Sequence, residues 1–208
     1  MSLFLEIHPD NPQRRLVRRA VEILRAQEGN VMAYPTDSSY ALGCLVGDKA
    51  AMERIRRIRR LDKHHNFTLV VRDLSEIATY ARVDNRTFRF LKAHTPGPYT
   101  FILRATGEVP RRLQHPKRRT IGLRVPDHRI TQALLEELGE PLMSSTLILP
   151  GDDLPLTDPY EIRERLGKEL AVIIAGGYCV PEPTTVIDMT GEVPVIVRQG
   201  QGVIEELA

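Results

Sequence analysis

The chain has 208 residues, of which 42% are hydrophobic and 27% are charged. These values are ordinary for a globular protein and exclude a largely disordered one. The length suffices for one well-buried core, so we expect a single domain over residues 1–208. No segment has the unbroken apolar length of a membrane span, and the N-terminus lacks a secretion signal. We therefore expect a cytoplasmic protein that does not bind membranes, with a monomer favoured.

The elements predicted in chain order alternate between strand and helix. A strand at 3–7 precedes a helix that begins at Asn11-Pro12 and ends near residue 28, and a buried strand at 31–34 breaks at Pro35. A helix at 49–59, a strand at 67–71 and helices at 74–80 and 85–94 follow. Next come strands at 99–103 and 120–125, a helix at 129–138, a strand at 142–145, a helix after Pro159, and strands at 171–174, 185–189 and 195–197. This order predicts an α/β fold, with a twisted open mixed sheet flanked by helices.

Cysteine and histidine positions give no metal or disulfide signal. Cys44 and Cys179 form no CxxC motif and no cysteine–histidine cluster. His64 and His65 are adjacent in sequence, and adjacent residues rarely face one metal ion. We therefore predict no metal site in the protein itself and assign no role to any histidine.

Basic residues gather in three clusters, at 14–19, 54–63 and 111–119, although the net charge is only +2. The first cluster is the polar face of a helix whose other face carries Leu16, Ala20 and Leu24. The other two clusters are either ordinary solvated surface or part of a one-signed surface that binds a polyanion.

Hydroxyl side chains concentrate where loops are expected to leave strands. The segment PTDSSYALG packs five hydrogen-bonding side chains, at residues 36–40, into one strand-to-loop transition. It suits a small polar ligand, or it is a polar turn that caps the next helix. Ser144-Ser145-Thr146 and Thr184-Thr185 lie at two other strand ends. Ligand sites of open α/β sheets lie at such ends.

Taken in order, the segments YPTDSSYALG, PGPYTFIL, TIGLRVP, PLMSS, TTVID and VRQG resemble the signature series of YrdC-like proteins. The resemblance covers nearly the whole chain. The segments IHPDNP, MERI, HNFTL and EVPRRL look closer to the YciO branch of that family. The resemblance implies a twisted α/β sheet with a basic concave surface.

The synthases of this family join threonine, bicarbonate and ATP, with Mg²⁺, into threonylcarbamoyl-AMP for tRNA modification. Residue-by-residue matching implies a threonine-binding set of Thr36, Ser38, Tyr40 and Thr184. It implies a nucleotide-binding set of Arg59, Ser144, Thr146 and Arg198. Arg124 matches a family arginine that is either a cation of the site or a partner in a structural ion pair.

Three positions depart from the synthase pattern. Its Lys-x-Arg motif aligns with Arg59 and Leu61, its Ser-x-Asn motif with Thr146 and Ile148, and a frequent histidine with Arg72. A hydrogen bond to a charged group is worth about 1.5 to 3 kcal/mol, so losing one charged and one amide contact lowers catalysis by roughly two to four powers of ten. Arg60 or Lys63 are the cations close enough in sequence to compensate.

We therefore expect a protein that binds a nucleotide and RNA, double-stranded or tRNA-like, with a degenerate synthase site. The low aromatic content of 5% and the absence of tryptophan favour recognition of the RNA backbone. The predicted phosphate contacts are Arg56, Arg60, Arg111, Arg112, Lys117, Arg118 and Arg119. The alternatives are a threonylcarbamoyl-AMP synthase that uses ATP and Mg²⁺, and shared segments that serve only the fold.

Overall fold

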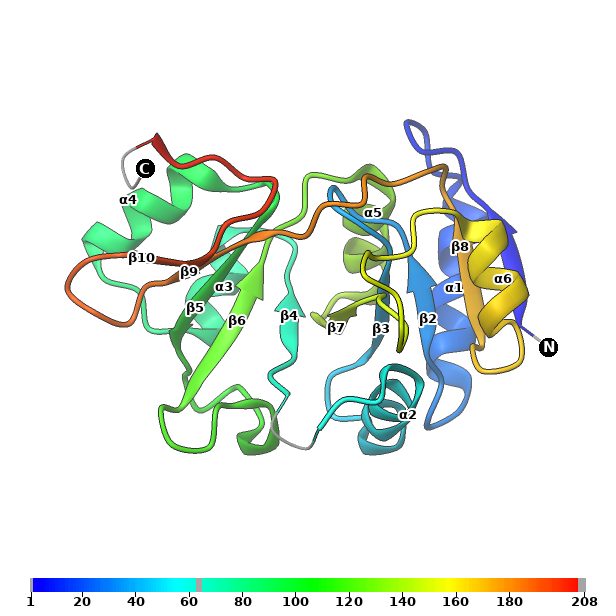
Figure 1. Ribbon diagram of the computed structural model, residues 1–208, viewed down its shortest axis with the longest axis horizontal. Coiled ribbons are helices and arrows are strands. Elements are labelled where there is room, and N and C mark those ends of the chain that lie inside the picture. The colour runs from blue at the N-terminus through cyan, green and yellow to red at the C-terminus, as the bar shows by residue number, and fades with distance from the viewer. Residues whose placement is uncertain (1, 63–64, 206–208) are drawn as a thin grey trace.

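The computed structural model describes residues 2–62 and 65–205, so Lys63 and His64 lie outside the described residues. A single mixed sheet of ten strands runs through the molecule, with helices packed on both faces (Figure 1). The strands are β1 (Leu3–Glu6), β2 (Met32–Tyr34), β3 (Ala41–Leu45), β4 (Thr68–Val70), β5 (Tyr99–Arg104), β6 (Thr120–Arg124), β7 (Leu142–Thr146), β8 (Val172–Ala175), β9 (Thr185–Asp188) and β10 (Val195–Arg198). The helices are α1 (Arg14–Ala26), α2 (Lys49–Arg59), α3 (Leu74–Tyr80), α4 (Asn85–His94), α5 (Arg129–Leu138), α6 (Pro159–Leu166) and the short 3₁₀ helix η1 (Arg111–Leu113).

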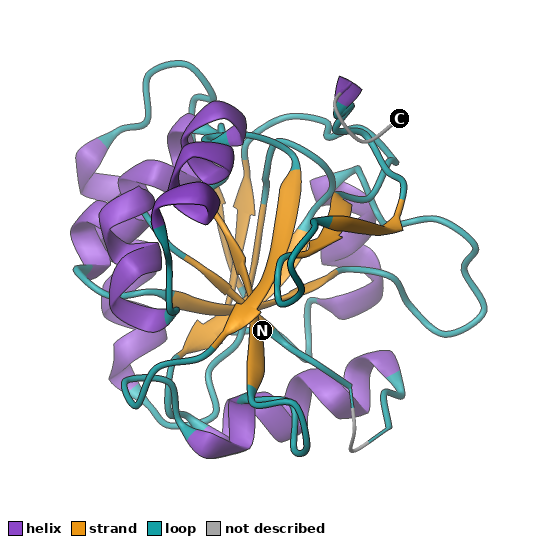
Figure 2. Ribbon diagram, turned by 90° about the vertical axis from the view of Figure 1, so that its left-hand side faces the viewer, coloured by secondary structure: helices purple, strands orange, loops and turns teal. Residues whose placement is uncertain are grey.

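The strand order across the sheet is β1-β8-β2-β3-β7-β4-β6-β5-β9-β10. Parallel pairs, such as β4 with β6, are mixed with antiparallel pairs, such as β3 with β7. Figure 2 shows the strands turning relative to one another between helices on either side. The predicted fold class, a twisted open mixed sheet flanked by helices, is confirmed. Within the described residues, no helix is both long and apolar enough to cross a bilayer.

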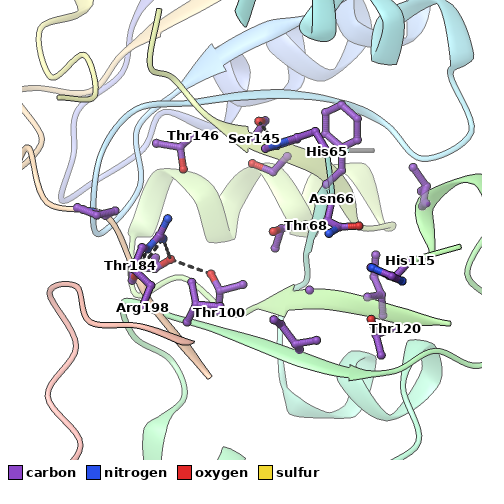
Figure 3. A pocket seen from close by; sticks show the side chains of 18 of the residues that line it. His65, Asn66, Thr68, Thr100, His115, Thr120, Ser145, Thr146, Thr184 and Arg198 are labelled. Carbon is purple, nitrogen blue, oxygen red and sulfur yellow. Dashed lines mark hydrogen bonds between the residues drawn. The ribbon is translucent and has the colours of Figure 1, made fainter. Parts of the chain in front are cut away.

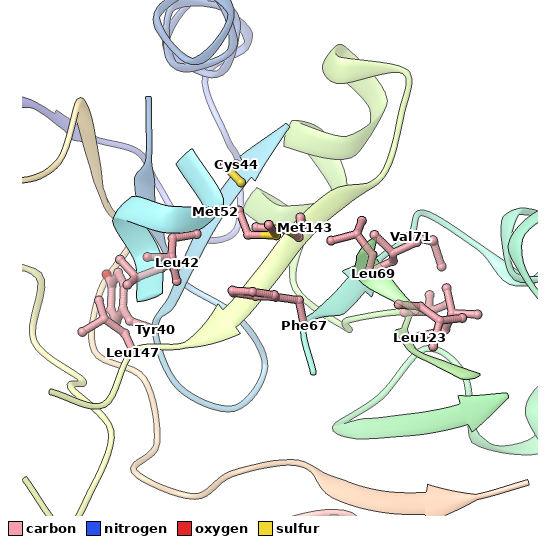
Figure 4. Packing of buried hydrophobic residues seen from close by; sticks show 14 of the residues in the cluster. Tyr40, Leu42, Cys44, Met52, Phe67, Leu69, Val71, Leu123, Met143 and Leu147 are labelled. Atoms are coloured by element: carbon pink, nitrogen blue, oxygen red, sulfur yellow. The ribbon is translucent and has the colours of Figure 1, made fainter. Parts of the chain in front are cut away.

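Alternation along the strands places two separate apolar cores on the two faces of the sheet. In β2, Ala33 packs in one core and its neighbour Tyr34 in the other. The larger core also takes in Leu69, Leu123 and Met143, which are paired side by side across β4, β6 and β7 (Figure 4). Helices α2, α3, α4 and α6 contribute to this core. The second face is covered by α1 and α5, which contribute to the smaller core.

Strand β3, at the centre of the sheet, was not predicted from the sequence. The segment was predicted to be a polar strand-to-loop transition that leads into the helix at 49–59. The structure explains the glycine at position 43: a Cβ at Gly43 would lie 2.7 Å from Cε1 of Tyr34, so the glycine makes room for the tyrosine ring on the neighbouring strand. Helix α1 also begins later than predicted, at Arg14 rather than at Asn11-Pro12, with Gln13 as its N-cap.

We expect Gly43→Ala to destabilise the fold by about 1 to 3 kcal/mol, because the added methyl group must displace the buried ring of Tyr34. Gly107→Ala is the matched control, since a Cβ there meets no atom within 4 Å. The control should change the free energy of unfolding by no more than about 0.5 kcal/mol. Urea denaturation measures both, and equal stability of the two variants would contradict the packing argument.

Candidate functional site

A cavity of about 270 Å³ opens over strands β7, β4, β6 and β5, on the sheet face that carries the smaller core and beside the part of it that α1 and α5 cover (Figure 3). Its floor is a row of side chains in register across four strands. Ile102 is paired with Gly122, Gly122 with Thr68, and Thr68 with Ser144. On the opposite face the neighbouring positions are apolar and form the larger core. The floor of the cavity thus presents Gly122 and the hydroxyl side chains of Thr68 and Ser144.

Arg59, Ser145 and His65 lie together at one side of this cavity. Arg59, at the end of α2, donates from Nε to the carbonyl of Ile148 at 3.1 Å and from its guanidinium to Oγ of Ser145. The same hydroxyl lies 3.5 Å from Nε2 of His65. Burial lowers the pKa of Arg59 to about 10. Burial and, to a smaller extent, the Arg59 charge lower the pKa of His65, which is therefore neutral at pH 7.

Arg198 and Thr184 form another side of the cavity. Arg198 donates from Nη2 to the carbonyl oxygen of Thr184 at 2.9 Å. The hydroxyl of Thr184 shares a 2.8 Å hydrogen bond with that of Thr100 (Figure 3). Burial lowers the pKa of Arg198. An anionic ligand bound next to this arginine would stabilise its charged form. The four residues matched to nucleotide binding, together with Thr184, therefore all line one cavity.

The other residues matched to threonine binding lie outside the cavity lining. Thr36 and Ser38 are buried, and both accept hydrogen bonds from Nη2 of Arg124. The same guanidinium forms an ion pair with Asp37, in which each side chain is only 9% exposed. Tyr40 is fully buried and donates its hydroxyl to the carbonyl of Gly177. The sequence left open whether Arg124 is a cation of the site or a partner in a structural ion pair. In the structure it forms the ion pair.

The three departures from the synthase pattern fall in different places. Ile148 lines the cavity, where it presents a hydrocarbon side chain. Leu61 packs against the larger core. Arg72 pairs with Asp73 and Glu76 on the surface and is not part of the cavity lining. Only the first departure changes the chemistry that a ligand in the cavity would meet. Arg60, considered as a compensating cation, lines a separate hollow with Arg57 and Arg165.

A second concavity, of about 670 Å³, borders the β5–β6 loop and is called here the basic hollow. Its lining includes five arginines and one histidine, and no acidic side chain occurs among its described lining residues. The basic members are Arg82, Arg104, Arg111, His115, Arg118 and Arg119. Arg118 also pairs with Asp188, at 2.5 Å.

The predicted phosphate contacts divide between this hollow and other places. Arg111, Arg118 and Arg119 line it. Arg112 donates to the carbonyl of Gly47, and Lys117 is exposed without lining a described hollow. Arg56 lies over the ring of Phe67 and pairs with Glu53, with its side chain 15% exposed, so it offers less to a ligand than its sequence cluster indicated.

Several lining residues were not predicted from the sequence. In the cavity they are Thr68, Thr100, His65, Asn66, His115 and Thr120, and in the basic hollow they are Arg82 and Arg104. Each of them depends on which strands pair, and no local motif signals that. Within the described residues, no three histidine, cysteine or acidic side chains gather to hold a metal ion.

The chain is similar to known proteins over most of its length. The family model Sua5_yciO_yrdC, described as telomere recombination, matches residues 25–200. YciO of Escherichia coli is 60% identical over 202 residues, 97% of each chain, and its crystal structure covers 100% of both chains with a TM-score of 0.95 and 58% identity. A threonylcarbamoyl-AMP synthase of Nitrosococcus oceani is 33% identical over 161 residues, 77% of this chain and 85% of the synthase.

The fold match extends to a more distant solved structure. A structure of P. abyssi Sua5 aligns with a TM-score of 0.89 at 25% identity and covers 99% of this chain and 62% of that one. The family model spans most of the chain, and the relatives share both sequence and fold over nearly all of it. The chain therefore belongs to the Sua5/YciO/YrdC family.

Proposed function

We propose that the chain binds a nucleotide in the cavity and RNA on the basic hollow, with a site related to threonylcarbamoyl-AMP synthases but altered in its chemistry. The observation that carries the proposal is the pair of arginines, Arg59 and Arg198, that reach one hydroxyl-lined cavity from α2 and β10. Guanidinium groups suit phosphate oxygens because they donate two parallel hydrogen bonds.

The size of the cavity favours one nucleotide over the full substrate set of a synthase. Ligand pockets for small molecules usually enclose about 300 to 1,000 Å³, and this one encloses about 270 Å³. ATP and threonine together require more room than that. Thr36, Ser38 and Tyr40 would also have to exchange the hydrogen bonds that they make within the protein before they could hold an amino acid.

Mg²⁺ finds no carboxylate among the described residues that line the cavity. Protein sites for Mg²⁺ usually supply one or two carboxylates beside the phosphates of the substrate. The lining therefore does not fit a metal held by the protein, and nucleotide binding here rests on the arginines and hydroxyls alone.

The basic hollow supports the RNA part of the proposal. No acidic side chain occurs among its described lining residues, and although Arg118 pairs with Asp188, the charges of the other arginines add up over one surface. Apart from the His115 imidazole, no aromatic ring occurs among the same described lining residues, which suits contacts to phosphates and riboses better than base stacking.

We expect Arg198→Gln to weaken AMP binding by about tenfold or more, because a hydrogen bond to a charged group is worth about 1.5 to 3 kcal/mol. Isothermal titration calorimetry measures the affinity. Arg72→Gln is the matched control, since this arginine pairs with Asp73 and Glu76 outside the cavity. If both variants bind AMP like the unaltered protein, the cavity is not the nucleotide site.

We expect Arg111→Glu with Arg119→Glu to reduce RNA affinity sharply and to lower the slope of log affinity against log salt by about two, one for each lost phosphate contact. Arg14→Glu with Arg15→Glu, on the exposed face of α1, changes the net charge equally and is the control. Filter binding at several salt concentrations measures both. An equal loss in the two double variants would show that net charge alone acts, without a site at the basic hollow.

With ATP, Mg²⁺, threonine and bicarbonate, we expect no threonine-dependent release of pyrophosphate. The reason is that Ile148 offers no amide to the nucleotide and Leu61 is packed against the core. Ile148→Asn restores the synthase side chain at the one departure inside the cavity. Threonine- and bicarbonate-dependent release by the unaltered protein, with the adenylate confirmed by mass spectrometry, would establish the synthase function in place of the binding function proposed above.

A further inference from the structure

The nucleotide cavity and the basic hollow are neighbours that share two lining residues, His115 and Arg118. His115 belongs to the β5–β6 loop, and its backbone is paired with that of Thr120 on the cavity side through a 2.8 Å hydrogen bond. The two concavities therefore adjoin at these two side chains, and together they are called here the path.

The two ends of this path differ in chemistry. The basic hollow offers five arginines, and its described lining has no aromatic ring apart from the His115 imidazole. The cavity offers apolar walls from Phe67, Leu113 and Ile121 beside the hydroxyl floor. Charged phosphates fit the first set of side chains, and a nucleobase with its ribose fits the second.

At the cavity end of the path, Asn66 adds a side-chain amide that can form hydrogen bonds to a base. Its side chain lies in the cavity between His65 and Thr68 (Figure 3). The amide makes no hydrogen bond to any residue that the structure describes. A carboxamide both donates and accepts, as the Watson–Crick edge of a base does.

We propose that one RNA strand occupies the whole path, with its backbone phosphates in the basic hollow and a single unstacked nucleotide inserted into the cavity. The inference rests on the proposed function and goes further, because it makes the nucleotide part of the RNA. The volume of about 270 Å³ lies just below the usual range for small-molecule pockets, so we assign the cavity a single nucleotide. Unpaired loops and strand ends supply such a nucleotide at the lowest cost in stacking energy.

The test compares two labelled RNAs of equal length, a stem–loop and a blunt duplex, by fluorescence anisotropy at one salt concentration. The stem–loop should bind about tenfold more tightly, the effect of one base contact. AMP should displace the stem–loop competitively and leave the duplex bound. A stem–loop with abasic loop positions should bind like the duplex.

Asn66→Ala should reduce stem–loop affinity to that of the duplex while duplex binding stays unchanged. Gly122→Val is a second variant with the same expected effect. The valine side chain would occupy the cavity floor beside Thr68, where a Cβ at position 122 would already lie 3.1 Å from the Thr68 hydroxyl oxygen. Circular dichroism confirms that each variant is folded. The double variant Arg111→Glu with Arg119→Glu should lower the affinity for both RNAs equally.

The outcomes separate this inference from the function on which it rests. If AMP and the stem–loop bind together without competition, the nucleotide and RNA are separate ligands and the single-strand path is wrong. Equal affinity for loop and duplex would overturn it as well. If AMP does not bind at all, the proposed nucleotide site itself fails, whatever the RNA results are.

Discussion

The buried ion pair between Arg124 and Asp37 is the interaction on which the site depends. Arg124 ends β6, and Asp37 follows β2, so the pair joins two strands that are not neighbours in the sheet. The second carboxylate oxygen of Asp37 accepts a 2.8 Å hydrogen bond from the backbone of Asp127, which fixes the chain after β6. Breaking a buried pair by removing one partner is strongly destabilising, because a charge is left without compensation.

The same pair accounts for the polar segment that follows β2. Thr36 and Ser38 are held by the arginine rather than turned toward the cavity. At the end of β2 itself, Tyr34 shares a 2.7 Å hydrogen bond with Ser144, and burial raises the pKa of this tyrosine to about 12. The Ser144 hydroxyl of the cavity floor is therefore held by a tyrosine that stays uncharged at neutral pH. A ligand meets a floor that is already arranged.

Much of the fold could be predicted from the sequence because alternating apolar residues identify strands and the periodicity of α1 and α5 identifies helices. Strand β3 could not, since Gly43 is explained only by the Tyr34 ring on the next strand. The site residues likewise divide into those that local sequence predicts and those that depend on strand pairing. Arg59 and Arg198 belong to ordered motifs, whereas Thr68 and Gly122 reach the floor through strand register, which local sequence does not encode. Arg82 and Arg104 were missed for a related reason, because they are far apart in sequence and are joined by a 2.8 Å backbone hydrogen bond beside the Ala81–Ala105 bridge.

The strand order has a consequence for how the chain reaches its native state. Residue 3 in β1 pairs with residue 172 in β8, and residue 101 in β5 pairs with residue 187 in β9. Such a high contact order slows folding, because the entropy of closing long loops is lost before the strand pairings stabilise the chain. During synthesis the first strand waits unpaired until the eighth has left the ribosome. The sheet that carries the cavity is thus completed late, from both ends of the chain.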